Sequence, residues 1–482
     1  MSMTDDNQLQ AIIAHAKEYG FIFQSSEIYD GLSAVYDYGP YGSELKKNIR
    51  DYWWKSMTQM HNNIVGIDAA IFMHPTTWKA SGHLANFSDP MIDNKDSQKR
   101  YRVDHLIETF AEKLEKNNKP DEAKLLLEEM DALLKKDDFD GLKSLIEKNK
   151  ISCAVSGTAN WTPIRQFNLM FSTQLGSVSD ETNEIYLRPE TAQGIFVNFL
   201  NVQKSARMKI PFGIAQTGKA FRNEIVARQF IFRMREFEQM EMQFFIQPGT
   251  QMQWYEYWKN ERLQWHLSLG IDPAKYRFHD HVKLAHYADA AVDIEYNFPF
   301  GFKEVEGIHS RTDFDLASHQ KFSNKKLTYF DPELNKHYIP YVIETSIGLD
   351  RMCLVIMSNS FEEEVLKKED GSTDTRTVMH IPPIIAPIKL AILPLTKKDG
   401  LPELARDILD TCKYHFRCFY EEKDTIGKRY RRQDAIGTPF CITIDHQSKE
   451  DEMVTLRHRD SMLQERISIS SITQTIQNYL LL

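Results

Sequence analysis

The sequence predicts an α+β domain built on an antiparallel sheet, interrupted by a helical insertion and followed by a C-terminal α/β domain. Three observations lead to this prediction: strand-like runs on either side of a loop in residues 212–246, a charged helical stretch at 104–149, and alternating strand and helix patterns after residue 388. A chain of 482 residues is also too long for a single hydrophobic core. We therefore expect a first domain at 1–385, with the insertion at about 93–160, and a second at 386–482.

The composition is that of an ordinary globular protein. It has 42% hydrophobic and 26% charged residues, and no run approaches the roughly 18 apolar residues of a membrane span. The N-terminus carries no basic cluster ahead of an apolar stretch, which argues against a secretory signal. The five cysteines never form a Cys-x-x-Cys pair, which argues against a disulfide framework and a structural zinc site. These features predict a cytoplasmic protein with no membrane contact.

The N-terminal part of the sequence shows a helix that leads into a strand. Apolar residues of 44–61 recur close to one helical face, residues 64–73 are strand-like, and Pro75 follows. The stretch 104–149 is rich in Lys, Glu and Leu and is broken near 118–120 and 137–138. It is therefore expected to form a small helical insertion.

The stretch 212–246 predicts two strands, and the second has two chemically different faces. The two-residue period of a strand places Arg233, Arg235, Phe237, Gln239 and Glu241 on one face and mostly apolar residues on the other. Guanidinium groups suit phosphate, a ring suits base stacking, and a carboxylate suits an exocyclic amine, so this face can form the floor of a nucleotide site. A solvated sheet face with cross-strand ion pairs explains the same pattern.

Two shorter stretches place charged residues beside the starts of helices. Glu190 follows Pro189 and leads into an apolar helix. Glu344 and Ser346 share a face at the end of a strand predicted at 338–345, and Arg351 lies in the helix predicted at 347–359. Taken alone, Glu190 is a favourable first-turn residue and Arg351 an ordinary surface residue.

After the proline-rich linker at 381–387, strand and helix patterns alternate. They cover residues 389–395, 401–414, 416–420, 426–436, 440–444 and 472–481. This order predicts a compact α/β domain with a mostly parallel sheet. The domain contains a local basic run at 428–432, although the net charge of −9 does not favour a nucleic-acid partner.

Together these stretches resemble the three signature motifs of the class II aminoacyl-tRNA synthetases, in the order known for that class. The helix, the strand and Pro75 resemble motif one, residues 221–224 with 235–237 resemble motif two, and Gly348-Leu349-Asp350-Arg351 resembles motif three. Within the class, the resemblance is to the dimeric glycyl enzymes and runs through nearly the whole chain. It is carried by residues 25–29, 36–40, 187–196, 237–241 and 292–296.

The resemblance implies an enzyme that uses ATP and Mg²⁺ to activate glycine as its adenylate and then transfers it to the 3′ end of tRNA(Gly). Arg222 and Arg351 are the implied catalytic residues, and Phe237 and Arg351 would enclose the adenine ring. The implied ATP-binding residues are Arg222, Asn223, Glu224, Phe232, Arg233, Arg235, Phe237, Glu304, Val305, Gly348 and Arg351. The implied glycine-binding residues are Arg102, Glu190, Phe237, Glu241, Arg311, Glu344 and Ser346. Magnesium would arrive with ATP, and Glu344 is a candidate protein ligand for it.

The C-terminal part resembles the anticodon-binding domain of several class IIa synthetases, and the family also implies a homodimer. Lys428, Arg429, Arg431 and Arg432 would then contact RNA, whereas a solvated helix face is the alternative interpretation of such a run. Two alternatives remain for the whole chain: a class IIa enzyme for threonine, proline, serine or histidine, and a non-catalytic nucleic-acid-binding paralogue.

Several positions depart from the family pattern. Residues 93–97 stand where many relatives carry Cys-x-x-Cys, Thr345 replaces a proline, and Ile308-His309-Ser310-Arg311 replaces the common Ile-Ala-Asn-Arg. The motif-two loop also differs, and Arg228 in it is a candidate contact to phosphate or to the acceptor end.

A group of histidines, His279, His281 and His286, suggests a metal site. Two histidines separated by one residue lack the helical spacing of typical zinc motifs, and no cysteine completes a set. The sequence therefore does not predict a metal site at these positions.

Overall fold

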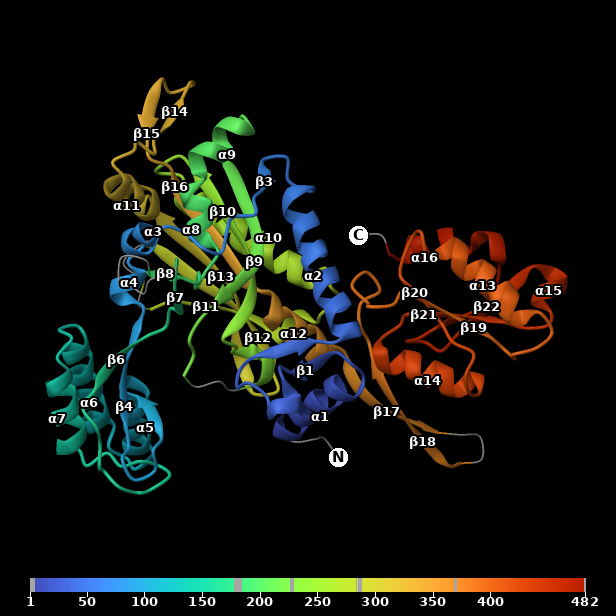
Figure 1. The fold of residues 1–482 in the computed structure, drawn as a ribbon, viewed down its shortest axis with the longest axis horizontal. Helices are drawn as coiled ribbons and strands as arrows, with labels where there is room; N and C mark the ends of the chain where they lie inside the picture. Colours follow the sequence, from blue (N-terminus) through green and yellow to red (C-terminus); the bar gives the residue numbers. More distant parts are fainter. Residues whose placement is uncertain are drawn as a thin grey trace. The chain divides into compact units, whose positions relative to one another are not determined.

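A computed structural model describes residues 5–176, 184–225, 229–282, 284, 288–367 and 371–480 of the protein. The chain forms two compact units, residues 1–73 with 190–482 and residues 74–189. Among the helices of the described residues, none combines the length and the apolar character that crossing a membrane requires. Figure 1 shows the elements, coloured from the N-terminus to the C-terminus.

The first unit is built on a seven-stranded sheet (Figure 1). Its strand order is β11 (Tyr276–Asp280), β12 (Ala290–Phe298), β13 (Gly301–Thr312), β16 (Tyr341–Gly348), β10 (Glu236–Ile246), β9 (Phe212–Phe221) and β3 (Ile64–Gly66). Every neighbouring pair is antiparallel except β9 with β3. The predicted antiparallel sheet is therefore confirmed, and its three central strands bring distant parts of the sequence together.

Strand β10 has one apolar and one polar face, as its two-residue period predicts. Met240, Met242 and Phe244 are buried in a core that the strand shares with the helices on that side. These helices are α1 (Asp5–Glu18), α2 (Pro40–Thr58), α10 (Gln251–Leu267) and α12 (Leu349–Ser360). One end of the polar face is covered, and Phe199, Phe212 and Phe245 pack together there. The short helices at that end are α8 (Ala192–Val197), α9 (Phe199–Ser205) and α11 (Phe314–Ser323).

A β-bulge in β13 changes which residues of that strand reach the polar face. Glu295 of β12 pairs with Glu304 and its neighbour Ile294 pairs with Glu306, which leaves Val305 as the extra residue. An extra residue inverts the alternation of a strand on its far side. Glu304 therefore joins the odd-numbered residues Gly307 and His309 on the polar face, and the Val305 side chain is buried in the core.

Several boundaries of the first unit differ from the prediction. The strand expected at 64–73 is limited to β3 (Ile64–Gly66), and Pro75 begins helix α3 (Pro75–Ala80). Proline suits the first turn of a helix because its missing N–H needs no partner there. Before residue 386, the remaining strands of this unit are β1 (Ile22–Gln24), β2 (Tyr36–Tyr38), β14 (Tyr329–Asp331), β15 (Lys336–Tyr338), β17 (Phe361–Lys367) and β18 (Thr373–Met379). Short 3-10 turns lie at Glu27–Tyr29, Phe230–Phe232 and Pro273–Lys275, and another lies in the C-terminal part at Ile469–Ser471.

The second unit, residues 74–189, contains the predicted helical insertion. Its helices end at the predicted breaks, and Ile107, Leu126, Leu145 and Trp161 form a core of its own. Its elements are α3 (Pro75–Ala80), α4 (His83–Asn86), β4 (Ser88–Asp93), β5 (Arg100–Arg102), α5 (Val103–Lys116), α6 (Pro120–Leu134), α7 (Phe139–Lys148), β6 (Arg165–Asn168), β7 (Ser172–Gln174) and β8 (Glu184–Tyr186). The strands were not predicted from the sequence, because they are short, with three to six residues each.

The turn at 93–97 is held by side-chain hydrogen bonds. The buried Asn94 Oδ1 accepts from Ser97 Oγ at 3.1 Å and from Ser156 Oγ at 2.9 Å. Ser97 Oγ also lies 3.2 Å from Cys153 Sγ. A polar network thus stiffens this turn.

The C-terminal part has the predicted strand and helix order but a mixed sheet. Its elements are β19 (Leu390–Pro394), α13 (Leu401–Cys412), β20 (Cys418–Tyr420), α14 (Ile426–Ile436), β21 (Phe440–Ile444), α15 (Ser448–Asp451), β22 (Met453–His458), β23 (Gln464–Ser468) and α16 (Ile472–Tyr479). The order is β20-β19-β21-β22-β23, and the pairs β21–β22 and β22–β23 are antiparallel. The prediction of a mostly parallel sheet is wrong because the segments that join β21, β22 and β23 are too short for a parallel crossover.

Candidate active site

The open part of the polar sheet face holds a cavity of about 210 Å³. Its walls come from β10, β13 and β16, from the segment between β9 and β10, from Glu190 just before α8, and from the start of α12. The predicted site residues that line it are Glu190, Arg222, Glu224, Phe232, Arg233, Phe237, Glu241, Glu304, Arg311, Glu344, Ser346, Gly348 and Arg351. The structure thus brings Glu190 and side chains from the segments that resemble motifs two and three to one place.

One end of the cavity carries cationic groups on aromatic rings. The Arg222 guanidinium lies 5.2 Å from the centre of the Phe237 ring, and that of Arg351 lies 4.4 Å from the centre of the Phe232 ring. Arg351 Nη1 also donates to the Glu304 carbonyl at 3.0 Å and lies 3.2 Å from its carboxylate. The Arg351 charge holds the pKa of Glu304 below its ordinary value. Such an end suits an anion attached to a planar ring.

Three predicted nucleotide residues do not line the cavity with their side chains. Asn223 and Arg235 are absent from its walls, and the bulge turns the Val305 side chain into the core. Arg235 instead fastens the segment after β9, because it donates to the carbonyls of Glu224 and Ser33, both at 3.0 Å. Arg235 is therefore placed to position its neighbours.

The other end of the cavity is formed by buried carboxylates around one guanidinium. Arg311 Nη1 donates to both oxygens of Glu344, at 2.9 and 3.0 Å, and His309 Nδ1 lies 2.7 Å from Glu344 Oε2. Gln243 Nε2 bridges Glu344 and Glu241, at 2.8 and 2.9 Å. Thr191 donates to Glu241, and Glu190 accepts from Gln193 at 2.9 Å.

The neighbours of these carboxylates set their proton affinities in opposite directions. Burial raises the pKa of Glu241 well above its ordinary value, and the charges of Glu344 and Glu190 raise it further. Burial also opposes ionisation of Glu344, but Arg311 and His309 outweigh it, so the pKa of Glu344 lies well below its ordinary value. Burial lowers the pKa of His309, yet the bond to Glu344 and its charge outweigh that effect and raise it. Glu241 therefore holds a proton more tightly than Glu344 does.

Asp350 lines the cavity, although the sequence analysis assigned it no role. Its carboxylate accepts from Tyr38 at 2.5 Å, from Lys46 at 2.7 Å and from the backbone N–H of Glu238 at 2.7 Å. These bonds tie the first turn of α12 to β10 and α2, which fixes the origin of the Arg351 side chain. An acidic residue in a first helical turn is too common to attract attention by itself.

Arg102 lies in the second unit, where it pairs with Asp104 at 2.5 Å and with Asp89 at 3.3 Å. Two further candidates, Arg228 and His286, lie outside the described residues. The structure therefore adds nothing to the predicted roles of these two.

The basic residues of α14 are less available to bind RNA than the sequence suggests, because three of them already have partners. Arg429 is buried and donates to the carbonyls of Pro394 at 2.7 Å and Glu421 at 3.1 Å, so the prediction that it contacts RNA is wrong. Arg431 pairs with Asp374 at 2.9 Å, and Arg432 pairs with Glu421 at 2.7 Å. Lys428 is exposed.

Three protein families match successive parts of the chain. The tRNA synthetase class II core domain (G, H, P, S and T) matches residues 171–360, the glycyl-tRNA synthetase insertion domain 1 matches 89–125 and 117–169, and the anticodon binding domain matches 389–479.

Similarity to individual proteins extends over almost the whole chain. The glycine–tRNA ligase of Chlorobaculum tepidum is 51% identical over 475 residues, which cover 98% of this chain and 100% of the relative. That of Staphylococcus haemolyticus is 53% identical over 467 residues, covering 96% and 97%. That of Treponema denticola is 50% identical over 478 residues, covering 98% of each. The chain therefore belongs to the glycine–tRNA ligase family of class II aminoacyl-tRNA synthetases.

Proposed function

We propose that the cavity binds ATP and glycine side by side and joins them as glycyl-adenylate, and that the glycyl group then passes to the 3′ end of tRNA(Gly). The single observation that carries this proposal is the division of one cavity into an arginine-rich end and a carboxylate-rich end. An amino acid whose recognised groups are an ammonium and a carboxylate matches the second end. The relatives are named for glycine, which favours glycine over threonine, proline, serine or histidine.

Arg222 and Arg351 act on the nucleotide. The glycine carboxylate attacks the α-phosphorus, the bond to pyrophosphate breaks, and negative charge grows on the phosphoryl oxygens. A preorganised guanidinium such as that of Arg222 stabilises this charge, and the attacking carboxylate is already ionised, so no base has to remove a proton. Arg351 and Phe237 enclose the adenine ring, and Glu224 accepts its amine. Phe232, Arg233, Glu304 and Gly348 complete the ATP site.

Magnesium enters with ATP, where it neutralises phosphate charge. Glu344 is poorly suited to bind it, because both of its oxygens already accept bonds from Arg311 and one also bonds His309. We therefore assign Glu344 to the amino-acid site, together with Glu190, Glu241, Ser346 and Arg311. Arg102 remains a predicted member of that site.

Pyrophosphate exchange tests the activity directly. The purified protein should exchange pyrophosphate into ATP with glycine, but not with threonine, proline, serine or histidine. Arg222→Ala should lower the rate by at least about 100-fold, because it removes a group that stabilises the transition state. Exchange is measured with labelled pyrophosphate.

Arg277→Ala is the matched control, because Arg277 pairs with Glu295 on the same sheet and does not line the cavity. Near-normal exchange by Arg222→Ala would contradict the role of Arg222. No exchange with any amino acid would favour the non-catalytic alternative.

Glu241→Gln tests the proton affinity of Glu241. The folded-state pKa of Glu241 lies above its ordinary value of 4.5, so the folded protein holds a proton that the unfolded chain releases above that pH. Folding stability therefore falls as the pH rises, and a neutral glutamine avoids this loss. The variant should melt about 2 °C or more above the parent protein at pH 8, with the difference vanishing near pH 4.

The same variant should lose glycine-dependent exchange by at least about 100-fold, because the ammonium loses a buried charged partner. Glu256→Gln, on the exposed side of α10, is the control for the melting measurement. A variant that is less stable than the parent protein at pH 8 would show that Glu241 is ionised in the free cavity.

The C-terminal part, residues 386–482, is proposed to bind the anticodon, with the catalytic domain at 1–385 and the insertion at about 93–160 within it. The match of residues 389–479 to an anticodon binding domain supports this division. Lys428, Arg431 and Arg432 remain the proposed RNA contacts, and Asp374 and Glu421 would have to release the two arginines.

Replacing Lys428 and Arg431 by alanine should raise the KM for tRNA by about tenfold and leave pyrophosphate exchange within about twofold, since two phosphate contacts are lost. Aminoacylation and exchange are measured on the same preparation. Arg406→Ala, an exposed arginine paired with Glu422, is the control. Equal losses in both assays would refute a role confined to the anticodon.

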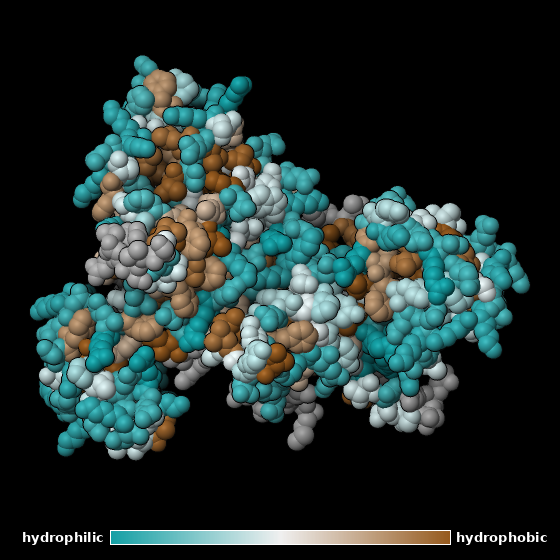
Figure 2. Space-filling model, in the orientation of Figure 1, coloured by the Kyte–Doolittle hydropathy of each residue, from teal (hydrophilic) through white to brown (hydrophobic). Residues whose placement is uncertain are grey.

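A homodimer, with a cytoplasmic location, is the proposed state of the enzyme. Figure 2 shows hydrophobic surface over the part of the view that holds α9, α11 and the β14–β15 hairpin, and Phe322, Phe330 and Leu334 are exposed in these segments. Apolar surface of this kind marks an interaction site. Sedimentation velocity at about 10 µM should show a particle of two 56.2 kDa chains, and a particle of one chain would contradict the dimer.

A further inference from the structure

Two histidines and one aspartate meet on the polar face of the sheet, beside the carboxylate-rich end of the cavity. The backbone N–H of His281, just after β11, donates to the Ala291 carbonyl of β12 at 3.1 Å. Ala291 is paired with His309 of β13, and His309 is paired with Glu344 of β16. Strand register therefore fixes His281, His309 and Glu344 in one row, with Asp293 two residues along β12 from Ala291.

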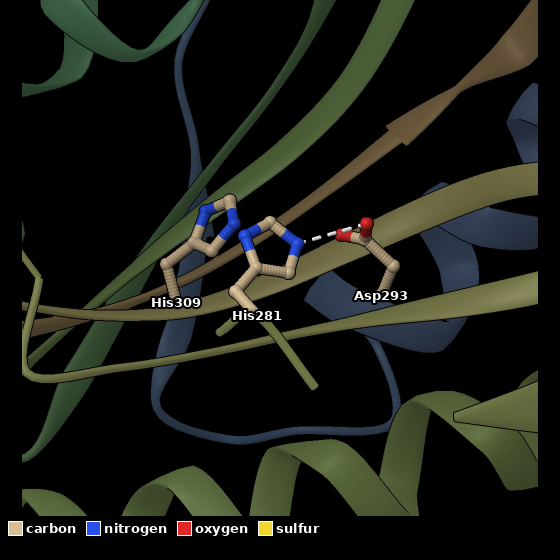
Figure 3. Close-up of side chains that lie close together, drawn as sticks. All are labelled: His281, Asp293 and His309. Atoms are coloured by element: carbon tan, nitrogen blue, oxygen red, sulfur yellow. Dashed lines mark ion pairs between the residues drawn. The ribbon is translucent and has the colours of Figure 1, made fainter. Parts of the chain in front are cut away.

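The ligand-bearing atoms of His281, Asp293 and His309 all lie within 4.8 Å of one another. His281 Nε2 is 2.9 Å from Asp293 Oδ2, and the rings of His281 and His309 have their centres 5.7 Å apart. Figure 3 shows the two imidazoles side by side, with the aspartate next to His281. Two ligands of a tetrahedral metal ion are about 3.3 Å apart when each bond is near 2.0 Å, so small side-chain movements suffice.

Small residues keep the space beside these atoms open. Gly307 is paired with Asp293, and a Cβ at this glycine would lie 3.4 Å from His309 Nε2 and 3.5 Å from Asp293 Oδ1. Ala291 lies between His281 and His309 in this row, and its side chain is only a methyl group. The side chains of His281, Asp293 and His309 are 33%, 14% and 19% exposed, so an ion can reach them from solvent.

His309 already has the second contact that metal-binding histidines use. Its Nδ1 lies 2.7 Å from Glu344 Oε2, which leaves Nε2 for a metal ion. A carboxylate on the second nitrogen orients a histidine ligand and strengthens its donor atom.

We propose that His281, Asp293 and His309 form a binding site for a divalent transition-metal ion such as Zn²⁺ or Co²⁺. Two imidazoles and one carboxylate are a ligand set that such ions prefer, and three protein ligands leave one position open. An ion on His309 Nε2 is coupled to the amino-acid end of the cavity, because the other ring nitrogen, Nδ1, contacts Glu344. This coupling, but not the ion site itself, rests on the proposed function. The sequence argument against a metal considered neighbouring histidines and could not foresee ligands from three strand segments.

Cobalt titration tests the site without using activity. Full-length protein freed of metal by a chelator, without ATP or Mg²⁺, should bind one Co²⁺ with the visible absorption of a tetrahedral complex, and Zn²⁺ should displace it. His281→Ala and Asp293→Asn should each weaken binding by at least about 100-fold. Failure of the parent protein to bind Co²⁺ at about 1 mM would overturn the proposal, as would parent-like binding by His281→Ala.

Two control variants separate this site from other histidines. His279→Ala removes the neighbour that pairs with Glu295, and His380→Ala removes a second potential ligand group with Glu362 and Glu364. Both should bind Co²⁺ like the parent protein, and loss of binding in His380→Ala alone would assign the ion elsewhere and overturn the proposal.

The coupling has its own readout. Zn²⁺ should change the KM for glycine in the parent protein and in His279→Ala but not in His281→Ala. A bound ion that leaves this KM unchanged would refute the coupling and leave the ion site standing. Absence of any exchange activity would refute the proposed function without touching the cobalt result.

Discussion

The contact between Arg311 and Glu344 at the centre of the sheet is the interaction on which the rest of the site depends. Both side chains are almost completely removed from solvent, and a buried charge is tolerated only when a partner and further hydrogen bonds compensate it. Arg311 also donates from Nε and Nη2 to the two oxygens of Asp315, at 2.8 and 3.1 Å, so a single guanidinium holds two carboxylates. The sheet supports this arrangement because β13 and β16 are neighbours, and the apolar opposite face anchors both strands in the main core.

The preference of Glu344 for the ionised form affects how tightly its neighbour Glu241 holds a proton. Two carboxylates in one buried space cannot both ionise without a large cost, and the donors around each decide which one keeps the proton. Arg311 and His309 face Glu344, whereas the neutral groups Thr191 and Gln243 donate to Glu241. Glu344 therefore favours the charged form, and Glu241 holds a proton more tightly than Glu344 does. An arriving ammonium group can replace that proton, which makes recognition a matter of charge rather than of shape.

The parts of this site that the sequence predicted are those that depend on a regular period or on the family resemblance. Alternation along β10 correctly placed Phe237, Gln239 and Glu241 together, because a paired strand has an exact two-residue repeat. That Glu190, Arg222 and Arg351 would meet was predicted by resemblance, since no local pattern specifies which distant strands pair. Asp350 was missed because its role is to join three elements, and no property of its own segment reveals that.

The errors share a physical origin: each depends on a contact between segments. The bulge adds one unpaired residue, Val305, to β13, and this turns the Glu304 side chain to the polar face. A strict two-residue period does not predict such an insertion. Arg429 belongs to a basic run, yet it is the residue of that run that turns inward to bind carbonyls of the neighbouring strand end. A count of charges does not distinguish the four basic residues of this run, although Arg429 is buried and Lys428 is exposed.

His309 shows how far one side chain can act when strand register is rigid. Its imidazole reaches Glu344 on one side and the space beside Asp293 on the other. No strand has to move, because His309 and Glu344 are already cross-strand neighbours. The His309 donor strengthens the preference of Glu344 for the charged form, so the consequence is felt at Glu241, which His309 need not touch. A side chain on β13 can thus alter the proton balance of Glu241 and Glu344 through the sheet that carries all three residues.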